Sequence, residues 1–357
     1  MRKIFGFALA ATMLASCGSN TKYTISGESE KFAGKYAYLQ IEQGNELQTV
    51  DSVAVAGNAF TLKGEVEAPY AAYVVVKDAG AERPEFYTEL FVEAAEIAIE
   101  EVAGERPSFK AVGGELNNMM NQINDNLMGI NERINAAAKA GDSTAEAAGE
   151  KELGEAIYSS IVSANGNLVG QDLLRANYYM LHPQQVIDAI DAMPADVQPG
   201  FEKMKSNAQQ ALKVLPGNPY LDIVEKDTKG NEITLKSVVE NKANKYVLID
   251  FWASWCPPCM REAPYLTATY EKYHKKGFEI FGVSFDRARE PWLKAIEDKN
   301  FNWVHVSAVN YWDNQARYDY AVNSIPANFL IDCSTGKIIA TALRGDNLEA
   351  KIAELLD

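Results

Sequence analysis

Two cysteines separated by two prolines, Cys256-Pro257-Pro258-Cys259, are the residues of this chain whose type and spacing point most directly to chemistry. A short apolar run precedes the pair, and an acid-bearing helix start follows it. Cysteines at this spacing suit a structural disulfide, part of a metal site or a redox centre. The surrounding sequence indicates which of these three kinds of site the pair forms.

Metal and haem sites lack the residues that they need. A zinc site takes four ligands, and no second cysteine pair exists, while His182, His274 and His305 are scattered along the chain. A c-type haem site takes a histidine directly after the second cysteine, where this chain has Met260. With only four cysteines in all, the chain is also unlike a disulfide-scaffolded secreted domain. We expect no metal and no cofactor.

The first residues resemble a bacterial export signal. Arg2 and Lys3 precede an apolar run over residues 4–15, which is shorter than the roughly 20 apolar residues that span a bilayer. The sequence LASC at 14–17 resembles a lipobox, which implies cleavage before Cys17 and attachment of lipid to its sulfur. The alternative is an ordinary signal cut nearby, which would leave Cys17 free.

The charge of the chain bears on what it can bind. Loss of Arg2 and Lys3 with the signal changes the formal net charge from −15 to −17, which repels nucleic acid and anionic lipid headgroups. We therefore expect membrane attachment through the lipid at Cys17 alone, and no nucleic-acid partner. Gly18 follows the cysteine and favours the outer over the inner membrane of a periplasm-facing lipoprotein.

The chain is too long for a single hydrophobic core, and changes in its sequence patterns indicate separate parts. Short alternating runs with Gly, Asn and Pro signals predict an antiparallel β-domain, apolar positions at helical spacing predict a helical region, and "LPGNPY" marks the start of the last domain. The predicted parts are signal 1–16, anchor and tether 17–22, β-domain 23–113, helical region 114–214 and final domain 215–357.

The helical region opens with one apolar stripe. A dimerising coiled coil needs three or four heptads with charged flanks, whereas this stripe has asparagine-rich flanks and contains Gly129. We expect it to pack against the helices that follow it. Its members are Leu116, Met120, Ile123, Leu127, Ile130 and Ile134.

Residues 215–357 alternate strand and helix patterns and end with a hairpin and a helix, which predicts a mixed sheet with helices on both faces. This order, with the cysteine pair directly after the strand "KYVLIDFW", resembles the thioredoxin fold. The subfamily that it resembles is the TlpA/ResA-like membrane-tethered thiol-disulfide oxidoreductases. The β-domain resembles the small domain of unknown function that precedes thioredoxin modules in Bacteroidetes lipoproteins. The fold class is therefore a thioredoxin-like α/β domain preceded by an antiparallel β-domain and a helical region.

The predicted position of the cysteines gives each of them a role. Cys256 falls where strand gives way to helix, and the unpaired amides and dipole of the helix start favour its thiolate, so it is the expected nucleophile. Cys259, one turn deeper, can attack the same sulfur and resolve a mixed disulfide. Pro257 and Pro258 place no charge between the cysteines, which favours a reductase because the reduced form is less stabilised.

Two acids frame the pair. Asp250 lies in the apolar run before the cysteines and matches the buried aspartate of thioredoxins, so we expect a raised pKa and a role in taking the proton of Cys259. Its alternative role is a strand-end residue bonded to the backbone. Glu262 matches the active-site glutamate of ResA-like proteins, and its alternative role is a helix-start acid that complements the dipole.

The resemblance also implies a substrate surface. Pro326 in "NSIPANFLID" stands at the position of the cis-proline of the fold, and Ile325 would then offer its amide and carbonyl to an extended substrate. A trans proline in a turn is the alternative. We expect Trp255 to be exposed for docking, Trp252 to lie in the core and Cys333 to be an inert, half-buried thiol.

These residues predict a lipid-anchored thiol-disulfide oxidoreductase, and more specifically a reductase. Its expected partners are protein disulfides, for example in cytochrome c maturation, and a membrane electron donor that reduces it again. A disulfide oxidase or isomerase would share every motif, and a non-enzymatic envelope lipoprotein with a structural disulfide is the other alternative.

Overall fold

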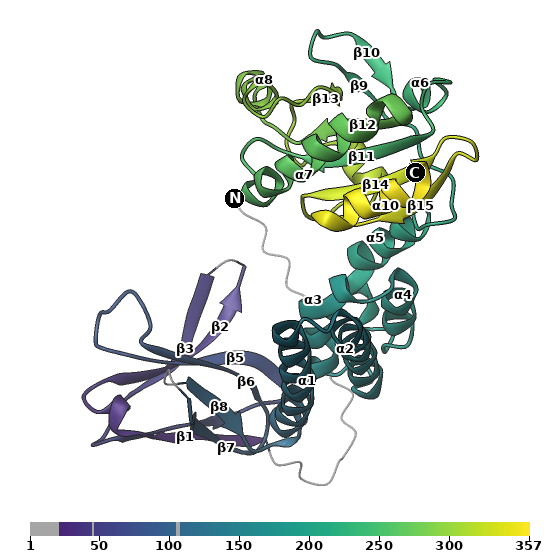
Figure 1. The fold of residues 1–357 in the computed structure, drawn as a ribbon. Helices are drawn as coiled ribbons and strands as arrows, with labels where there is room; N and C mark the ends of the chain where they lie inside the picture. Colours follow the sequence, from purple (N-terminus) through teal and green to yellow (C-terminus); the bar gives the residue numbers. More distant parts are fainter. Residues whose placement is uncertain (1–20, 45, 105–107) are drawn as a thin grey trace, which may run out of the picture. The chain divides into compact units, whose positions relative to one another are not determined.

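The computed structural model describes residues 21–44, 46–104 and 108–357 (Figure 1). The chain divides into two compact units, Met1–Met180 and Leu181–Asp357. Cys17 and the predicted signal lie outside the described residues. Within the described ranges, no helix is long and apolar enough to cross a membrane.

Two four-stranded sheets form the β-domain of the first unit, in the orders β4-β1-β7-β8 and β3-β2-β5-β6. In β1 and β4, alternate side chains point into the core, which is why the sequence shows a period of two there. Neighbouring strands run antiparallel except β1 and β7, which are parallel. The strands are β1 Lys22–Glu28, β2 Tyr36–Gln43, β3 Glu46–Ala54, β4 Ala59–Glu65, β5 Tyr70–Lys77, β6 Phe86–Val92, β7 Glu96–Val102 and β8 Ser108–Val112.

Three helices complete the first unit: α1 (Glu115–Ala140), α2 (Ser143–Ser163) and α3 (Leu168–Asn177). The turn between α1 and α2 is sharp, with Asp142 accepting a hydrogen bond from the amide of Ala145 as the helix cap. Ile134 of the apolar stripe sits directly on Gly149 of α2, where a Cβ would come within 2.6 Å of its side chain. The stripe therefore packs against the neighbouring helix.

The second unit begins with α4 (Pro183–Asp191) and α5 (Glu202–Leu212). The helical region expected as one part over residues 114–214 is thus shared between the two units. Gln210 of α5 donates a hydrogen bond to the carbonyl of Asp319, which lies among the C-terminal elements. His182 caps α4 through Nδ1, which accepts from the amide of Gln184.

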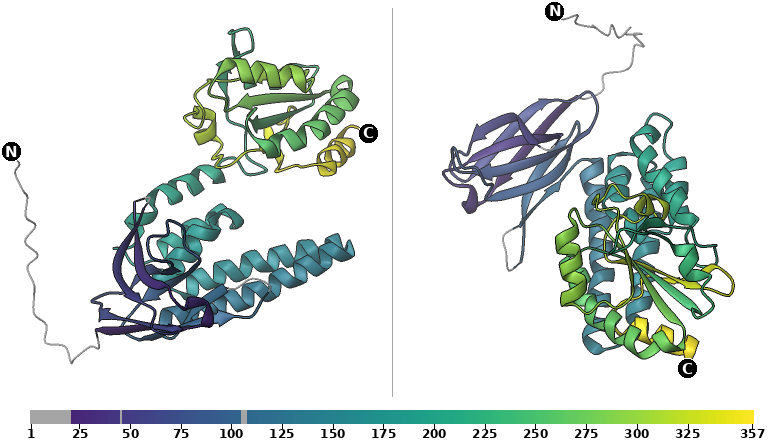
Figure 2. Two further views of the ribbon diagram at one scale, coloured as in Figure 1. Left: turned by 90° about the vertical axis from the view of Figure 1, so that its left-hand side faces the viewer. Right: turned by 90° about the horizontal axis from the view of Figure 1, so that it is seen from above.

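A five-stranded mixed sheet of order β13-β12-β11-β14-β15 is the centre of the second unit. Strands β11, β12 and β13 are parallel, β14 runs antiparallel to β11, and β15 runs antiparallel to β14. Figure 2 shows helices on both faces of this sheet, which explains why β11 and β12 are buried along almost their whole length. The strands are β11 Tyr246–Trp252, β12 Phe278–Ser284, β13 Val304–Val306, β14 Ala327–Asp332 and β15 Lys337–Thr341.

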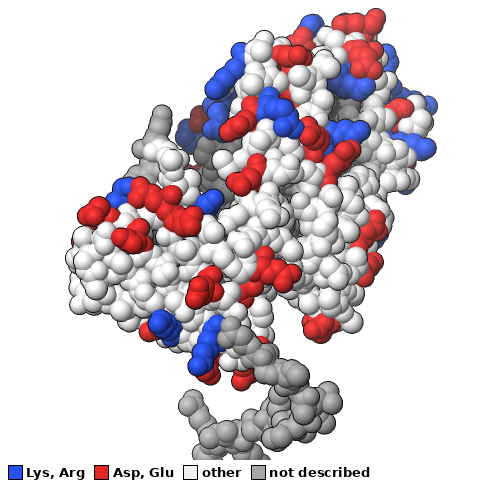
Figure 3. Space-filling view, turned by 90° about the horizontal axis from the view of Figure 1, so that it is seen from below, with Lys and Arg blue, Asp and Glu red and all other residues white. Residues whose placement is uncertain are grey.

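Shorter elements and helices surround this sheet, and α7 and α10 pack against each other. Acidic and basic side chains are interspersed over the described surface seen in Figure 3. The remaining elements of the second unit are the hairpin β9 Val224–Lys226 and β10 Glu232–Thr234 and the helices α6 Leu235–Val239, α7 Pro257–Tyr273, α8 Arg289–Asp298, α9 Gln315–Asp319 and α10 Asp346–Leu356.

Candidate redox site

The two cysteines lie at the junction of β11 and α7, where the central strand leaves the sheet and a helix begins. Cys256 is the N-cap residue of α7, and its sulfur accepts a hydrogen bond from the amide of Cys259 at 3.2 Å. The pair forms a disulfide with its Cα atoms 5.3 Å apart. In the reduced state, the same amide and the helix dipole would stabilise negative charge on Cys256.

The loop before β14 passes beside the sulfur of Cys256. The Ile325–Pro326 peptide bond is cis, and the carbonyl oxygen of Ile325 lies 3.6 Å from Sγ of Cys256. The cis-proline loop therefore places the backbone of Ile325 directly beside the sulfur of Cys256.

Asp250 lies inside the sheet on β11 and is only 4% exposed. Its pKa is raised to about 7: burial raises it most, the positive charge of Arg344 opposes this rise, and the charge of nearby Glu262 adds to it. A carboxyl with this pKa exchanges its proton near neutral pH, as a general acid or base does.

Glu262 extends from α7 to the loop before α10. Its Oε2 accepts a hydrogen bond of 2.9 Å from the amide of Gly345, and its charge also influences Asp250. The side chain therefore fixes the C-terminal loop in addition to lying near the helix start, and its electrostatic link to the site is through Asp250.

Arg344 is a site residue that the sequence-based reasoning missed. Its half-buried guanidinium donates to the carbonyl oxygens of Pro326 and Leu343, and it interacts electrostatically with Asp250 and Glu262. One cation thus connects the cis-proline loop with both acids. The only local feature that could have indicated Arg344 as a site residue is its place directly before Gly345, at the start of the last helix.

Asn328 of β14 holds Arg344 in this position. The Asn328 side chain accepts from the amide of Leu343 at 2.9 Å and donates to its carbonyl at 2.8 Å. On the sheet, Asn328 is the antiparallel neighbour of Asp250. The strand that carries the buried acid and the loop that carries its counter-charge are therefore fixed to the same residue.

Two family models match the chain. A thioredoxin-like family matches residues 244–338, and a domain of unknown function (DUF4369) matches residues 23–120. The first match contains the cysteine pair, Asp250, Glu262 and Pro326.

Curated relatives are similar to about two fifths of the chain. The thiol-disulfide oxidoreductase ResA of Bacillus anthracis is 32% identical over 143 residues, which cover 39% of this chain and 76% of that protein. Tryparedoxin of Trypanosoma brucei brucei is 34% identical over 142 residues, which cover 37% of this chain and 85% of that protein. The chain belongs to the thioredoxin-like thiol-disulfide oxidoreductases.

Solved structures of similar proteins each cover about two fifths of this oxidoreductase. The thioredoxin domain of a Bacteroides vulgatus thiol-disulfide oxidoreductase is 36% identical, with a TM-score of 0.37 and coverage of 40% of this chain and 99% of that one. A thiol-disulfide oxidoreductase from Bacteroides fragilis is 31% identical, with a TM-score of 0.36 and coverage of 39% of this chain and 100% of that one.

A second buried acid fixes the loop of the oxidoreductase just before the cysteines. Asp286 is fully buried and accepts hydrogen bonds from the amide of Ser254 at 3.0 Å and from the hydroxyl of Ser284 at 2.7 Å. This residue was not among those singled out from the sequence, because it follows β12 and reaches Ser254 only through the tertiary structure.

The two tryptophans near the cysteines have different environments. Trp252 is 2% exposed and packs edge-on against Phe301 in the core. Trp255 is 42% exposed, donates its Nε1 proton to the carbonyl of Phe285, and lies against the ring of Tyr311. Trp255 thus gives the oxidoreductase an apolar surface next to Cys256.

Cys333 is chemically quiet in this environment. It is half-buried at the end of β14, and burial together with the charge of Asp332 raises its pKa to about 11. A thiol with this pKa holds little thiolate at neutral pH.

Among the residues that the structure describes, no group of three or more His, Cys, Asp or Glu side chains is arranged to hold a metal ion.

Replacing Arg344 with methionine is expected to shift the pH dependence of the oxidoreductase. Without the guanidinium, the pKa of Asp250 rises further above 7, because its opposing positive charge is lost. The carboxylate form of Asp250 then appears at higher pH, and thiol-disulfide exchange at pH 7 should slow by about tenfold. The pH–rate profile checks this, with Arg344→Lys as the control that keeps the charge. An unchanged profile for Arg344→Met would show that the cation does not act on Asp250.

Proposed function

We propose that this oxidoreductase works as a reductase of protein disulfides. The observation that carries the proposal is the position of Cys256, which combines a helix-start amide on its sulfur with the carbonyl of Ile325 at 3.6 Å. Reduced Cys256 attacks one sulfur of a substrate disulfide, the substrate S–S bond breaks, and a mixed disulfide forms while the leaving substrate thiolate takes a proton.

The second step closes the internal disulfide. Cys259 loses its proton, attacks the sulfur of Cys256, and displaces the second substrate thiolate. The carboxylate of Asp250 is the proposed acceptor for that proton, which its pKa of about 7 suits. Two electrons pass to the substrate in total, and the enzyme is left with the Cys256–Cys259 disulfide.

The residues between the cysteines favour reduction over oxidation. Oxidising members of a thiol-disulfide series have a strongly stabilised thiolate, whereas Pro257 and Pro258 supply no charge to Cys256. The remaining stabilisation of the Cys256 thiolate comes from the helix-start amide of Cys259, which donates to its sulfur. An oxidase or an isomerase remains the alternative, because the same two cysteines would carry those reactions.

The proposed place of action is the cell envelope, with the protein facing the periplasm. The lipobox-like sequence before Cys17 supports a lipid anchor, and Gly18 supports the outer membrane. In an oxidising compartment the enzyme needs an electron donor to restore its thiols, so we include a membrane thiol-disulfide relay as its partner. Cysteines of apocytochrome c and misoxidised envelope proteins are the proposed substrates.

The resting thiol state in the cell tests the direction of electron flow. Cells are quenched with acid, free thiols are tagged with a mass-shifting maleimide, and tags are counted on the wild type and on Cys256→Ser. The thiol of Cys333 serves as the internal reference. Mostly reduced Cys256 and Cys259 support the reductase, and full oxidation would replace it with an oxidase or a structural disulfide, which activity on a model dithiol then separates.

A further inference from the structure

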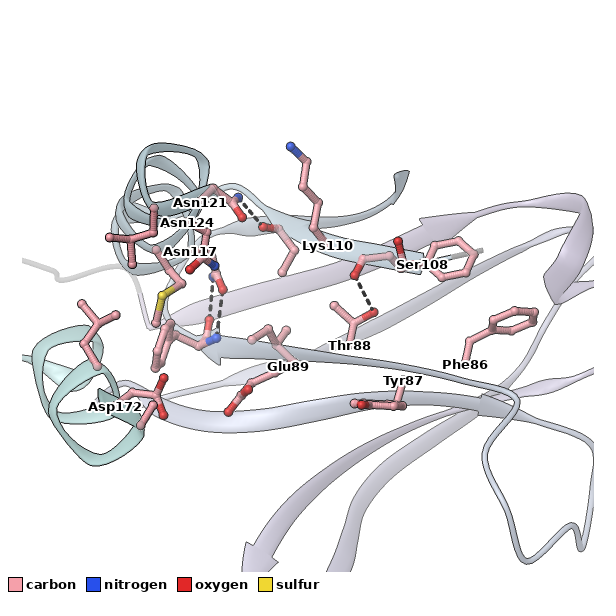
Figure 4. A pocket seen from close by; sticks show the side chains of 18 of the residues that line it. Phe86, Tyr87, Thr88, Glu89, Ser108, Lys110, Asn117, Asn121, Asn124 and Asp172 are labelled. Carbon is pink, nitrogen blue, oxygen red and sulfur yellow. Dashed lines mark hydrogen bonds between the residues drawn. The ribbon is translucent and has the colours of Figure 1, made fainter. Parts of the chain in front are cut away.

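A groove of about 640 Å³ lies within the first unit, between the strands β6 and β8 and the helices α1 and α3 (Figure 4). β6 and β8 are the edge strands of their respective sheets. The polar residues that line it include Tyr87, Glu89, Asn117, Asn121, Asn124 and Asp172.

Side chains of α1 already occupy part of both strand edges. Asn117 exchanges two hydrogen bonds with Phe91 of β6, accepting from its amide at 2.9 Å and donating to its carbonyl at 2.8 Å. Asn121 donates to the carbonyl of Ala111 on β8 at 2.8 Å. The bidentate contact of Asn117 copies the pair of bonds that a neighbouring strand would make, and it closes the groove at this end.

Among the described residues, the rest of the β6 edge has no strand paired with it. In an antiparallel strand, alternate residues direct both backbone groups to the same side. Tyr87 and Glu89 therefore share the outward side with Phe91, and the structure pairs neither of them with a further strand. Their amides and carbonyls are available to a chain that lies along the groove.

The charges around this edge are mainly negative. Partial burial raises the pKa of Glu89 and the carboxylate of Asp172 raises it further, while a hydrogen bond with Tyr73 opposes the rise. Burial also raises the pKa of Asp172, against the opposing charge of Arg175. Figure 4 shows Glu89 and Asp172 on the same side of the groove, and Lys110 is the one basic residue in its described lining. A cation between the carboxyl groups of Glu89 and Asp172 would offset the cost of burying their negative charges and the repulsion between them.

We propose that this groove binds an extended peptide segment, which pairs with the β6 edge at Tyr87 and Glu89 and places a lysine or arginine next to Glu89 and Asp172. Residues directly across from each other on paired strands have side chains on the same face, so a basic residue opposite Glu89 points to the acids. The exposed ring of Tyr87, 68% accessible, lies two residues away on that face and offers apolar contact. Asn124, exposed and without a hydrogen-bond partner, faces the same groove.

A direct binding measurement tests the proposal on the full chain. The probe is a fluorescein-labelled hexapeptide of alternating valine and threonine with one central lysine, compared with the same peptide carrying glutamate instead. Fluorescence anisotropy should show at least about tenfold tighter binding of the lysine peptide. Glu89→Gln combined with Asp172→Asn should remove this preference. Equal binding of the two peptides, or a preference that survives the double variant, would overturn the proposal.

Backbone pairing is tested separately. Tyr87→Pro removes one amide donor from an edge strand, a position where proline is tolerated, and it should weaken binding of both peptides. Tyr87→Phe keeps the backbone amide and should bind both peptides as the wild type does. Glu100→Gln on β7 removes one negative charge outside the groove and is the matched charge control. If Tyr87→Pro is folded by circular dichroism and binds the lysine peptide unchanged, the strand-pairing part is wrong. All these variants should keep wild-type disulfide reductase activity, so failure here is separable from failure of the proposed redox function.

Discussion

Replacing Cys259 with serine should trap the enzyme on its substrate. Cys256 can still attack a protein disulfide, but no second thiol follows to displace it, so a mixed disulfide through Cys256 accumulates. Multiple turnover of a model protein disulfide should fall by at least about a thousandfold, because two residues that act as a unit lose function together. Non-reducing electrophoresis of the reduced variant mixed with substrate detects the adduct, and mass spectrometry identifies the cysteine that carries it.

Cys256→Ser is the matched control for this trap. The remaining thiol of the pair, Cys259, lacks the helix-start position of Cys256, so this variant should form almost no adduct. Cys333→Ser should behave as the wild type. An adduct that runs through Cys259 would reverse the two assigned roles.

Replacing Asp250 with asparagine should slow disulfide reduction by about a hundredfold near neutral pH, the typical contribution of a general base. In the wild type, the carboxylate form that accepts a proton appears as the pH rises through the pKa of about 7. The rate of the resolving step should therefore rise with pH through this range, and in Asp250→Asn that rise should disappear. Rapid-mixing fluorescence across pH 5–9 measures it.

The same variant should be more stable than the wild type at high pH. The pKa of Asp250 is higher in the folded state, about 7, than its ordinary value of 3.8. Ionisation therefore costs folding free energy, and stability falls as the pH rises between these two values and stays lower above them. Asparagine does not ionise, so urea denaturation at pH 8 should show a larger free energy of unfolding. A loss of activity together with a loss of stability at pH 8 would indicate structural damage instead of a lost base.

Local sequence was sufficient where the chemistry depends on a junction between two adjacent elements. The apolar run of β11 ends just before Cys256, and Pro257 suits the first helical turn, so the position of Cys256 at the start of α7 follows from a few consecutive residues. The burial of Asp250 follows in the same way from its apolar neighbours. Such features need no knowledge of distant segments.

Contacts between distant segments could not be read from local patterns. Arg344 and Asp286 look like ordinary loop residues in the sequence, and only the folding of β14, β12 and α7 onto β11 brings them to the site. For the same reason, no local pattern separated α4 and α5 from α1, α2 and α3, because helical periodicity indicates a buried face but not which element covers it.

The sequence by itself determined the reactive pair, its strand-to-helix setting and the fold that carries them, because these depend on residue type and period along the chain. The tertiary structure alone decided the electrostatics of the site and the groove of the first unit. Arg344 acts on Asp250, and Asp172 on Glu89, through space. Charge interactions and exposed strand edges depend on which segments become neighbours in the folded chain. Local sequence patterns do not indicate which segments these are.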